Sequence, residues 1–194
     1  MKTVLLAKRL KVHFPDLLSE PRVFRDEVTL DVLDPQRIVE VCRYAKDELG
    51  FRFLVDLTGV DFPEEEPRFM VVYHLYHPEE RVHLRLRVRV DGDPPEVPSV
   101  TSVWRGANWH EREAWDMLGI RFRGHPNLKR ILMWEGYPYH PLRKDFPLEG
   151  KPTEVPGVAF TEAAPLEGGP FVARPGRTAR EREPRARPVE DQEG

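Results

Sequence analysis

The acidic side chains best placed to do chemistry lie close together at Glu111, Glu113 and Asp116. Two carboxylates can act as a general acid and a general base when both reach one substrate. On a regular helix, however, Glu111 and Glu113 project about 160° apart, because successive residues turn by about 100°. We therefore keep a stand-alone hydrolase that uses Glu111 or Glu113 only as a distant alternative. Glu113 and Asp116 are expected on a polar face that is solvated or faces a partner, with Arg112 one turn before Asp116 as its pair.

A metal site is the second kind of chemistry to consider. His110-Glu111 opens like the zinc-protease motif HExxH, whose second histidine must follow one turn later so that both imidazoles reach the metal. Ala114 occupies that position. His125 and His140 are far from His110 in the sequence, and each precedes a proline, which is typical of turn residues whose imidazole bonds the backbone. We therefore expect no metal site.

Glu111 is unusual because apolar residues surround it on a predicted helix. Asn108 is expected to cap this helix, with Glu111 at the capping-box position and Leu118 at its end. Projection onto a helix places Glu111 in the middle of a face that contains Ala114 and Trp115. Such a carboxylate has a raised pKa unless an arginine or backbone donors stabilise its charge. We expect a buried capping or ion-pair role rather than proton chemistry.

Hydrophobic periodicity predicts the elements that must position this helix. A short helix is expected over residues 2–13, and a second helix from Asp34, its N-cap, to Gly50. Strands are expected over residues 23–32, 51–60, 68–77 and 81–91. The loop between the last two strands is short enough for an antiparallel hairpin. A proline-rich connector over residues 93–98 then leads to the helix that carries Glu111.

The strand over residues 81–91 is expected to have one packed face and one cationic face, because valines and leucines alternate with Arg85, Arg87 and Arg89. A row of arginines can contact phosphates, but stacking aromatic residues do not interleave with this one. The net charge of −3 also disfavours nucleic acid as a partner. We expect these arginines to be solvated or paired with acidic groups.

Cys42 is the only cysteine of the chain. An intrachain disulfide is therefore excluded, and so is an iron–sulfur cluster held by this chain alone, which needs a set of cysteine thiolates. No stretch approaches the ~20 apolar residues of a membrane span, and the apolar run at residues 4–7 is too short for a signal peptide. We expect a cofactor-free chain in the cytoplasm that reaches a membrane only through partners.

The order of the elements predicts an α+β fold, with a small mostly antiparallel sheet, flanking helices and an extended C-terminal arm. We expect an α+β domain over residues 1–98 and a segment over residues 99–150 that packs on it. The remaining residues 151–194 are rich in proline and glycine and carry spaced apolar anchors, among them Phe160 and Phe171. Such a segment is predicted to wrap around a partner.

Residues 107–147, the signature region, carry a resemblance to a known family. The matching residues are, in order, Glu111-Arg112-Glu113, Trp115-Asp116-Met117, Gly119-Ile120, His125-Pro126, Leu128, Arg130-Ile131-Leu132 and His140-Pro141-Leu142-Arg143-Lys144-Asp145-Phe146-Pro147. In content and order they resemble the C subunit of respiratory NADH:quinone oxidoreductase, complex I. One departure is Tyr139, which stands where the family commonly has a glycine.

The resemblance implies a structural, non-catalytic subunit of the peripheral arm, on the cytoplasmic side of the cell membrane. It implies packing against the hydrogenase-like large subunit, the D subunit, which helps to form the quinone site, and against ferredoxin-like iron–sulfur subunits. FMN and the iron–sulfur clusters would be held by other subunits. The equivalent subunit of a membrane-bound hydrogenase or formate-hydrogenlyase complex is the alternative within the same class.

The partner interface is expected to include fixed charges and aromatic anchors of the signature region and of the C-terminal arm. We assign to it Trp109, Arg143, Lys144, Asp145, Phe160 and Phe171. Charge reversal at Arg143 is then predicted to weaken assembly without unfolding the chain.

Overall fold

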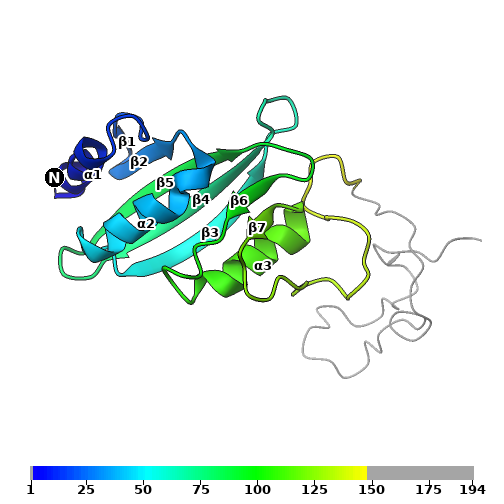
Figure 1. Ribbon diagram of the computed structural model, residues 1–194. Helices are drawn as coiled ribbons and strands as arrows, with labels where there is room; N and C mark the ends of the chain where they lie inside the picture. The colour runs from blue at the N-terminus through cyan, green and yellow to red at the C-terminus, as the bar shows by residue number, and fades with distance from the viewer. Residues whose placement is uncertain (1, 148–194) are drawn as a thin grey trace, which may run out of the picture. The chain divides into compact units, whose positions relative to one another are not determined.

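The computed structural model describes residues 2–147, and two helices occupy its first part (Figure 1). Helix α1 spans Lys2–His13, as predicted. Helix α2 spans Ile38–Asp47 and follows the short 3₁₀ turn η1, Pro35–Arg37. The carboxylate of Asp34 accepts a hydrogen bond from the Gln36 amide at 2.9 Å, so Asp34 caps η1. The predicted cap of the longer helix is corrected, because α2 itself begins after Arg37 without a side-chain cap. The apolar stripe of α2 is buried, at Ile38, Val41, Cys42 and Ala45.

The main sheet has five strands in the order β1-β2-β5-β4-β3. Their bounds are β1 Arg22–Phe24, β2 Glu27–Val32, β3 Phe53–Asp61, β4 Phe69–His77 and β5 Val82–Val90. Only the β2–β5 pair is parallel, so the sheet is mostly antiparallel, and β4 and β5 form the predicted hairpin. The prediction of one strand over residues 23–32 was wrong, because Arg25 and Asp26 adopt positive φ and fold it into a tight hairpin.

One face of this sheet forms the core. Leu30, Tyr73 and Leu86 point into it and are fully buried, and α2 lies across the sheet in Figure 1. The side chains that alternate with them on β5 are the half-exposed arginines. Their prediction as a cationic face paired with acidic groups is confirmed, since Arg87 bonds Asp31 at 2.7 Å and Arg85 lies 2.8 Å from Glu27.

Helix α3, Ala107–Leu118, carries the first part of the signature region and packs against β3 (Figure 1). Gly59 on β3 permits this approach, because a Cβ there would lie 2.9 Å from the Ile120 side chain and closer still to Leu118. Two short strands flank α3 in the sequence, β6 Glu96–Pro98 and β7 Arg121–Arg123, and pair in parallel. Neither was predicted, because three residues show no periodicity.

Among the described residues, Tyr137–Tyr139 and residues 145–147 belong to a unit separate from the rest. Among its described residues, the Tyr139 ring lies 5.6 Å from the Tyr137 ring and 5.9 Å from the Phe146 ring. The predicted arm over residues 151–194 lies outside the described residues. Within residues 2–147, none of the helices combines the length and the apolar character that crossing a membrane requires.

Candidate functional site

Glu111 lies on the inner face of α3 and is fully buried. Its Oε1 accepts a hydrogen bond from the Val100 amide at 2.7 Å, and its Oε2 accepts one from the Ser99 hydroxyl at 2.6 Å. Burial raises the pKa of Glu111 to about 7, although these two hydrogen bonds act in the opposite direction. The carboxyl group therefore fastens α3 to the segment that follows β6.

The predicted capping box is wrong. The helix begins at Ala107, Gly106 is the cap residue, and no side chain caps the helix. The amides of Ala107, Asn108 and Trp109 instead bond the carbonyl oxygens three residues earlier. Since these tight turns satisfy the first donors of α3, Glu111 is available to bond Ser99 and Val100. Its buried position in the apolar face is confirmed.

Asp116 is also fully buried, contrary to its predicted place on a polar face. Its Oδ2 accepts hydrogen bonds from three successive backbone amides, those of Ile131, Leu132 and Met133, at 3.0, 2.8 and 2.9 Å. Its Oδ1 lies 2.5 Å from Arg130. Burial acts to raise the pKa of Asp116, but the three amides and the guanidinium together hold it below its ordinary value.

Arg112 was expected to pair with Asp116, and this expectation was wrong. Its Nε donates to the Lys129 carbonyl at 2.9 Å and its Nη2 to the Arg130 carbonyl at 3.0 Å. The guanidinium also lies 5.1 Å from the Trp109 ring centre. Arg112 and Asp116 thus hold one loop together, because the arginine binds its carbonyl oxygens and the aspartate binds the amides that follow.

The C-terminal end of α3 is capped by the segment that contains His140. The carbonyls of Asp116, Met117 and Leu118 accept from His140 Nδ1 at 2.9 Å, the Leu142 amide at 3.0 Å and Arg143 Nε at 2.7 Å. The last carbonyls of a helix have no partner within the helix itself. Gly119 closes the helix with φ of 78°, and a Cβ there would lie 2.7 Å from His140 and closer to Arg143.

Asp61, at the end of β3, is a third buried carboxylate among the described residues, and sequence reasoning missed it. Arg68 binds both of its oxygens, at 2.6 and 2.7 Å, and the Lys144 amide donates to Oδ2 at 2.7 Å. Arg68 above all holds the pKa of Asp61 below its ordinary value. A charged residue directly after the predicted strand over residues 51–60 was the only available signal, because Lys144 is distant in the sequence.

His125 lies in a turn, as predicted. The Asn127 amide donates to Nδ1 at 3.0 Å, so Nε2 carries the proton and donates to the Asn108 carbonyl at 3.2 Å. This pattern fits a neutral imidazole, and burial lowers the pKa of His125. His140 is a backbone-bonded residue as well, and burial also lowers its pKa. Within residues 2–147, no group of three or more histidine, cysteine or acidic residues is placed to hold a metal ion.

The described carboxylates of the signature region therefore do not converge on a common substrate site. Glu111 and Asp116 bind different segments of this chain, and Glu113 is exposed, as expected. His125 and His140 bond the backbone, and His110 Nδ1 lies 3.3 Å from the Asp56 carboxylate. The geometry suits the fixing of several irregular segments around one helix.

The residues assigned to a partner interface differ in their exposure. Trp109 is 60% exposed, and the side chains of Lys144 and Asp145 are exposed as well. Arg143 is half-buried and lies 5.2 Å from the Phe69 ring centre, in addition to its bond with Leu118. Phe160 and Phe171 lie outside the described residues. Sequence reasoning missed two exposed apolar residues, Leu132 and Leu142, which are 62% and 58% exposed.

Residues 32–152 match a protein-family model described as the 30 kDa subunit of respiratory-chain NADH dehydrogenase. A Roseiflexus protein (strain RS-1), named as the C subunit of NADH-quinone oxidoreductase, is 49% identical over 156 residues, which are 79% of this chain and 86% of that protein. A Rhizobium etli protein, named as C subunit 2 of the same oxidoreductase, is 62% identical over 118 residues, which are 60% of this chain. The matched part spans only 63% of the length of that relative.

A third relative, from Sulfurihydrogenibium, is named as a C/D subunit of NADH-quinone oxidoreductase. It is 44% identical over 160 residues, which are 80% of this chain and 27% of that protein. Two solved structures are similar to the described fold. A trypsin-resistant fragment of Nqo5 gives a TM-score of 0.54 at 32% identity and covers 66% of this chain and all of the fragment. A chain of a membrane-bound sulfane sulfur reductase, an archaeal respiratory membrane complex, gives 0.66 at 25% identity, with coverage of 76% and 87%.

Proposed function

Because the chain belongs to the family of the 30 kDa subunit of respiratory-chain NADH dehydrogenase, we propose that it is a cofactor-free scaffold subunit of a proton-translocating NADH:quinone oxidoreductase. In this proposal the chain forms part of the peripheral arm on the cytoplasmic side of the cell membrane. It reaches the membrane only through its partners. FMN and the iron–sulfur clusters belong to other subunits, and this chain takes no catalytic step.

The observation that carries this proposal is the use of the signature side chains within the chain itself. A catalytic acid must reach the proton that it transfers, whereas Glu111 and Asp116 are fully buried and bond groups of their own chain. Their effect is to hold irregular loops in fixed positions around α3. A surface that is ordered before binding loses less conformational entropy when a partner docks, which favours tight assembly.

Two exposed leucines are candidates for the anchors of that surface. The Leu132 amide donates a hydrogen bond to Asp116, and the Leu142 amide donates one to the Met117 carbonyl. The backbone of both leucines is therefore held in place near the last turn of α3. Exposed apolar side chains on rigid backbone are well suited to fill pockets of a partner. Trp109, at the other end of α3, supplies an aromatic anchor of similar exposure.

The name of the Sulfurihydrogenibium relative supports a large-subunit partner. That protein is named as a C/D subunit, and this chain aligns with only 27% of its length. A segment similar to this chain therefore shares one polypeptide with a much longer remainder. We infer that the chain packs against the hydrogenase-like D subunit, with ferredoxin-like iron–sulfur subunits as neighbours.

A second candidate function is the equivalent subunit of a membrane-bound hydrogenase or formate-hydrogenlyase complex. The similarity to the archaeal sulfane sulfur reductase chain favours it, because that chain belongs to a different respiratory membrane complex. The higher identity to proteins named as C subunits of NADH-quinone oxidoreductase favours the first candidate.

The surface proposal is tested by co-expressing the full chain with the large subunit of the same organism. Leu132→Glu and Leu142→Glu are each expected to weaken binding at least about tenfold, because a charge is then desolvated at the interface. Leu5→Glu is the matched control, since Leu5 is 63% exposed on α1, outside the signature region. Binding of the Leu132 and Leu142 variants as tight as that of the control would contradict the assignment.

A further inference from the structure

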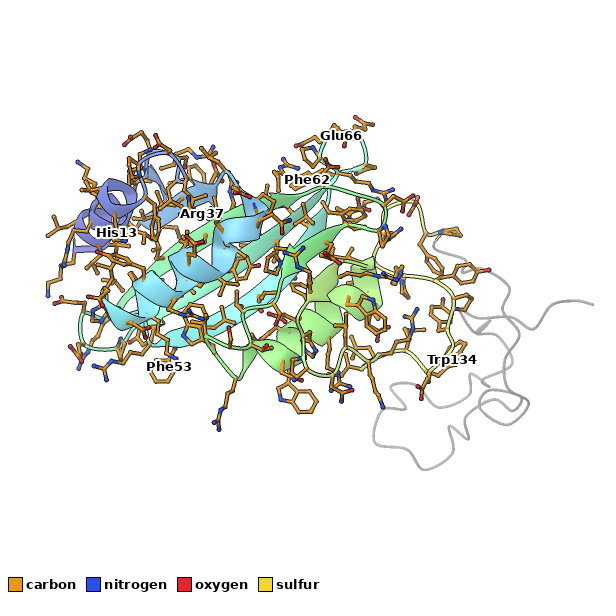
Figure 2. The ribbon with its side chains drawn as sticks, in the orientation of Figure 1. His13, Arg37, Phe53, Phe62, Glu66 and Trp134 are labelled. Atoms are coloured by element: carbon orange, nitrogen blue, oxygen red, sulfur yellow. The ribbon has the colours of Figure 1, made fainter. Side chains whose placement is uncertain are left out.

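A pocket of about 600 Å³ lies beside the start of β3. It is bounded by the C-terminal part of α2, the start of β3 and the turn that precedes α3. The lining residues are Lys46, Arg52, Phe53, Leu54 and residues 101–106. Phe53, which is 56% exposed, projects from the start of β3 at the edge of the sheet (Figure 2).

The ionisable side chains that line this pocket are all cationic, namely Lys46, Arg52 and Arg105. The Lys46 ammonium donates a hydrogen bond to the Val103 carbonyl at 2.5 Å, and an ammonium group has three donors in all. Arg52 lies 3.3 Å from Glu79, but both side chains are about two-thirds exposed, at 65% and 70%, so this pair neutralises it weakly. Arg105 is exposed. The pocket thus concentrates positive charge without a carboxylate in its lining.

The walls of the pocket are held in place by the buried groups of the fold. Glu111 binds Ser99 and Val100, immediately before the lining turn. Within that turn, the Val103 carbonyl bonds Lys46, and the Trp104 indole donates to the Arg52 carbonyl at 3.1 Å. The backbone that forms the walls of the pocket is therefore fixed before any ligand arrives, which lowers the cost of binding.

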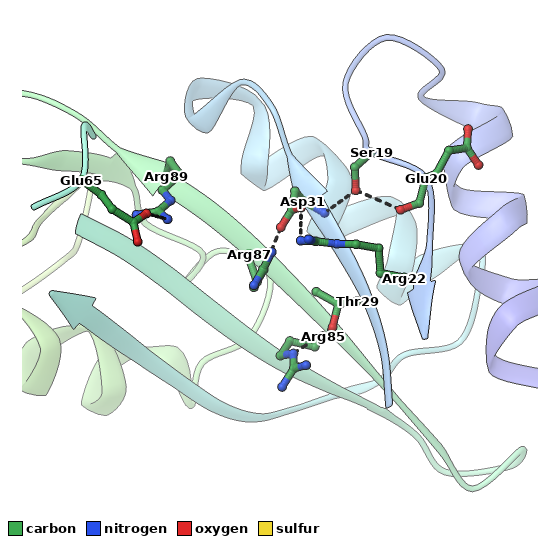
Figure 3. A network of polar contacts seen from close by, with 9 residues as sticks. All are labelled: Ser19, Glu20, Arg22, Thr29, Asp31, Glu65, Arg85, Arg87 and Arg89. Atoms are coloured by element: carbon green, nitrogen blue, oxygen red, sulfur yellow. Dashed lines mark hydrogen bonds and ion pairs between the residues drawn. The ribbon is translucent and has the colours of Figure 1, made fainter. Parts of the chain in front are cut away.

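A second pocket, of about 570 Å³, provides a contrast on the open face of the sheet. It also contains arginines, but acidic residues line it too. Arg87 bonds Asp31, and Arg89 pairs with Glu65, as Figure 3 shows. Its three arginines thus face two carboxylates of the same chain, with Asp31 shared by Arg22 and Arg87. Of these two pockets, the one beside Trp104 combines a fixed shape with positive charge that no lining carboxylate opposes.

We propose that the pocket beside Trp104 binds a phosphate-bearing anion. Guanidinium and ammonium groups form charge-assisted hydrogen bonds with phosphate oxygens, and the Ser102 hydroxyl adds a neutral donor to the lining. Phe53 and Leu54 offer an apolar wall to the organic part of the ligand. The phosphate belongs either to a soluble phosphorylated molecule or to the headgroup of an anionic phospholipid, since both present the same chemistry.

The test uses the full chain labelled with ¹⁵N, titrated with inorganic phosphate and pyrophosphate at constant ionic strength. The Trp104 indole signal is the reporter, and a saturable shift is expected. Ser102→Glu places a carboxylate among the cations, and Arg105→Gln removes one of them. Each change is expected to weaken binding by about tenfold or more. Arg43→Gln is the matched control, an exposed arginine of α2 outside the pocket lining, and is expected to bind as the unchanged chain does.

Vesicles of phosphatidylglycerol, compared with phosphatidylcholine, distinguish the two sources of phosphate. If the chain co-sediments with phosphatidylglycerol vesicles, if Ser102→Glu abolishes this binding and if Arg43→Gln preserves it, the ligand is a lipid headgroup. A Trp104 shift with the soluble phosphates but no co-sedimentation assigns a soluble ligand. The proposal is overturned if neither the soluble phosphates nor the phosphatidylglycerol vesicles bind, or if Ser102→Glu binds them as tightly as Arg43→Gln does. It is also overturned when a hexaglutamate peptide shifts Trp104 and the phosphates do not, which would assign an acidic protein segment.

Discussion

Glu111 and Asp116 are equally buried on the same helix, yet their pKa values move in opposite directions. Glu111 accepts hydrogen bonds from a hydroxyl and an amide, both neutral donors, so the cost of burying its charge prevails. Asp116 receives three amides and a guanidinium, which outweigh its own cost of burial. The donors, together with the depth at which each carboxyl group is buried, therefore set the opposite directions of the two pKa shifts.

The raised pKa of Glu111 predicts a stability that falls as the pH rises. The folded chain holds this proton up to about pH 7, whereas the unfolded chain releases it near 4.5. The free energy of unfolding should therefore be highest below about pH 4.5 for this group and decrease by about 3 kcal/mol as the pH approaches 7. Urea unfolding of the unchanged chain and of Glu111→Gln, across this pH range, measures the difference.

Glu113→Gln is the matched control for this experiment, because Glu113 is an exposed glutamate of the same helix. It should keep the pH dependence of the unchanged chain, whereas Glu111→Gln should lose the part that falls with rising pH. His125 and His140, whose lowered pKa values make stability rise with pH, contribute alike to the unchanged chain and to both variants, so the difference between the curves reports on Glu111. Asp61 and Asp116 do not interfere, because their pKa values are lowered and their contributions are lost only in more acidic solution. An equal slope for Glu111→Gln and the control would show that the Glu111 carboxyl does not titrate in this range.

Asp116→Asn is predicted to destabilise the chain by about 3 kcal/mol. The change removes the charge that faces Arg130, whose side chain is only 12% exposed, and it weakens the acceptor of the Ile131 to Met133 amides. Urea unfolding at neutral pH measures the loss. Asp47→Asn, at an exposed position of α2, serves as the control and should change stability little. A small effect at both positions would contradict the role assigned to Asp116.

At the scale of elements, long periodic segments were predicted well, because their burial pattern repeats along the sequence. The helix over residues 2–13 has the predicted bounds, and β3, β4 and β5 differ from the predicted strands by a few residues. Features that depend on distant residues were missed. The loop folded over Asp116 is one example, and the bond between Asp61 and the Lys144 amide is another. The start of α3 was misplaced because hydrogen bonds within a preceding turn replace a side-chain cap there.

The junction between α3 and the segment at His140 depends on the absence of a side chain at residue 119. Gly119→Ala is predicted to destabilise the chain both by its positive φ and by collision with His140 and Arg143. Gly124→Ala is the matched control, because φ there is 81° but no atom lies within 4 Å of the added Cβ. Both should lose about 1–2 kcal/mol from backbone strain, and Gly119→Ala about 1–3 kcal/mol more from overpacking. Thermal unfolding of both variants measures this difference, and equal losses would contradict it.

At the scale of the whole molecule, substitutions at the adjacent residues Arg143 and Lys144 are expected to differ in their effects on folding and on assembly. Arg143 bonds the Leu118 carbonyl and lies over Phe69, so Arg143→Glu is predicted to destabilise the fold as well as any interface. This differs from the sequence-based expectation of an effect on assembly alone.

Lys144 presents an exposed side chain while its amide bonds Asp61. Lys144→Glu should therefore weaken binding to the large subunit and leave the unfolding midpoint unchanged, as measured by pull-down and urea unfolding. Retained binding would remove Lys144 from the interface.

The composition of the native assembly tests the central proposal most directly. Membranes of the source organism are extracted with mild detergent, complexes are separated under native conditions, and the partners of this chain are identified by mass spectrometry. A scaffold subunit of NADH:quinone oxidoreductase should migrate in a large assembly that has NADH dehydrogenase activity and contains the large subunit and iron–sulfur subunits. Nickel–iron hydrogenase partners would support the second candidate function instead. A free chain without partners would contradict both.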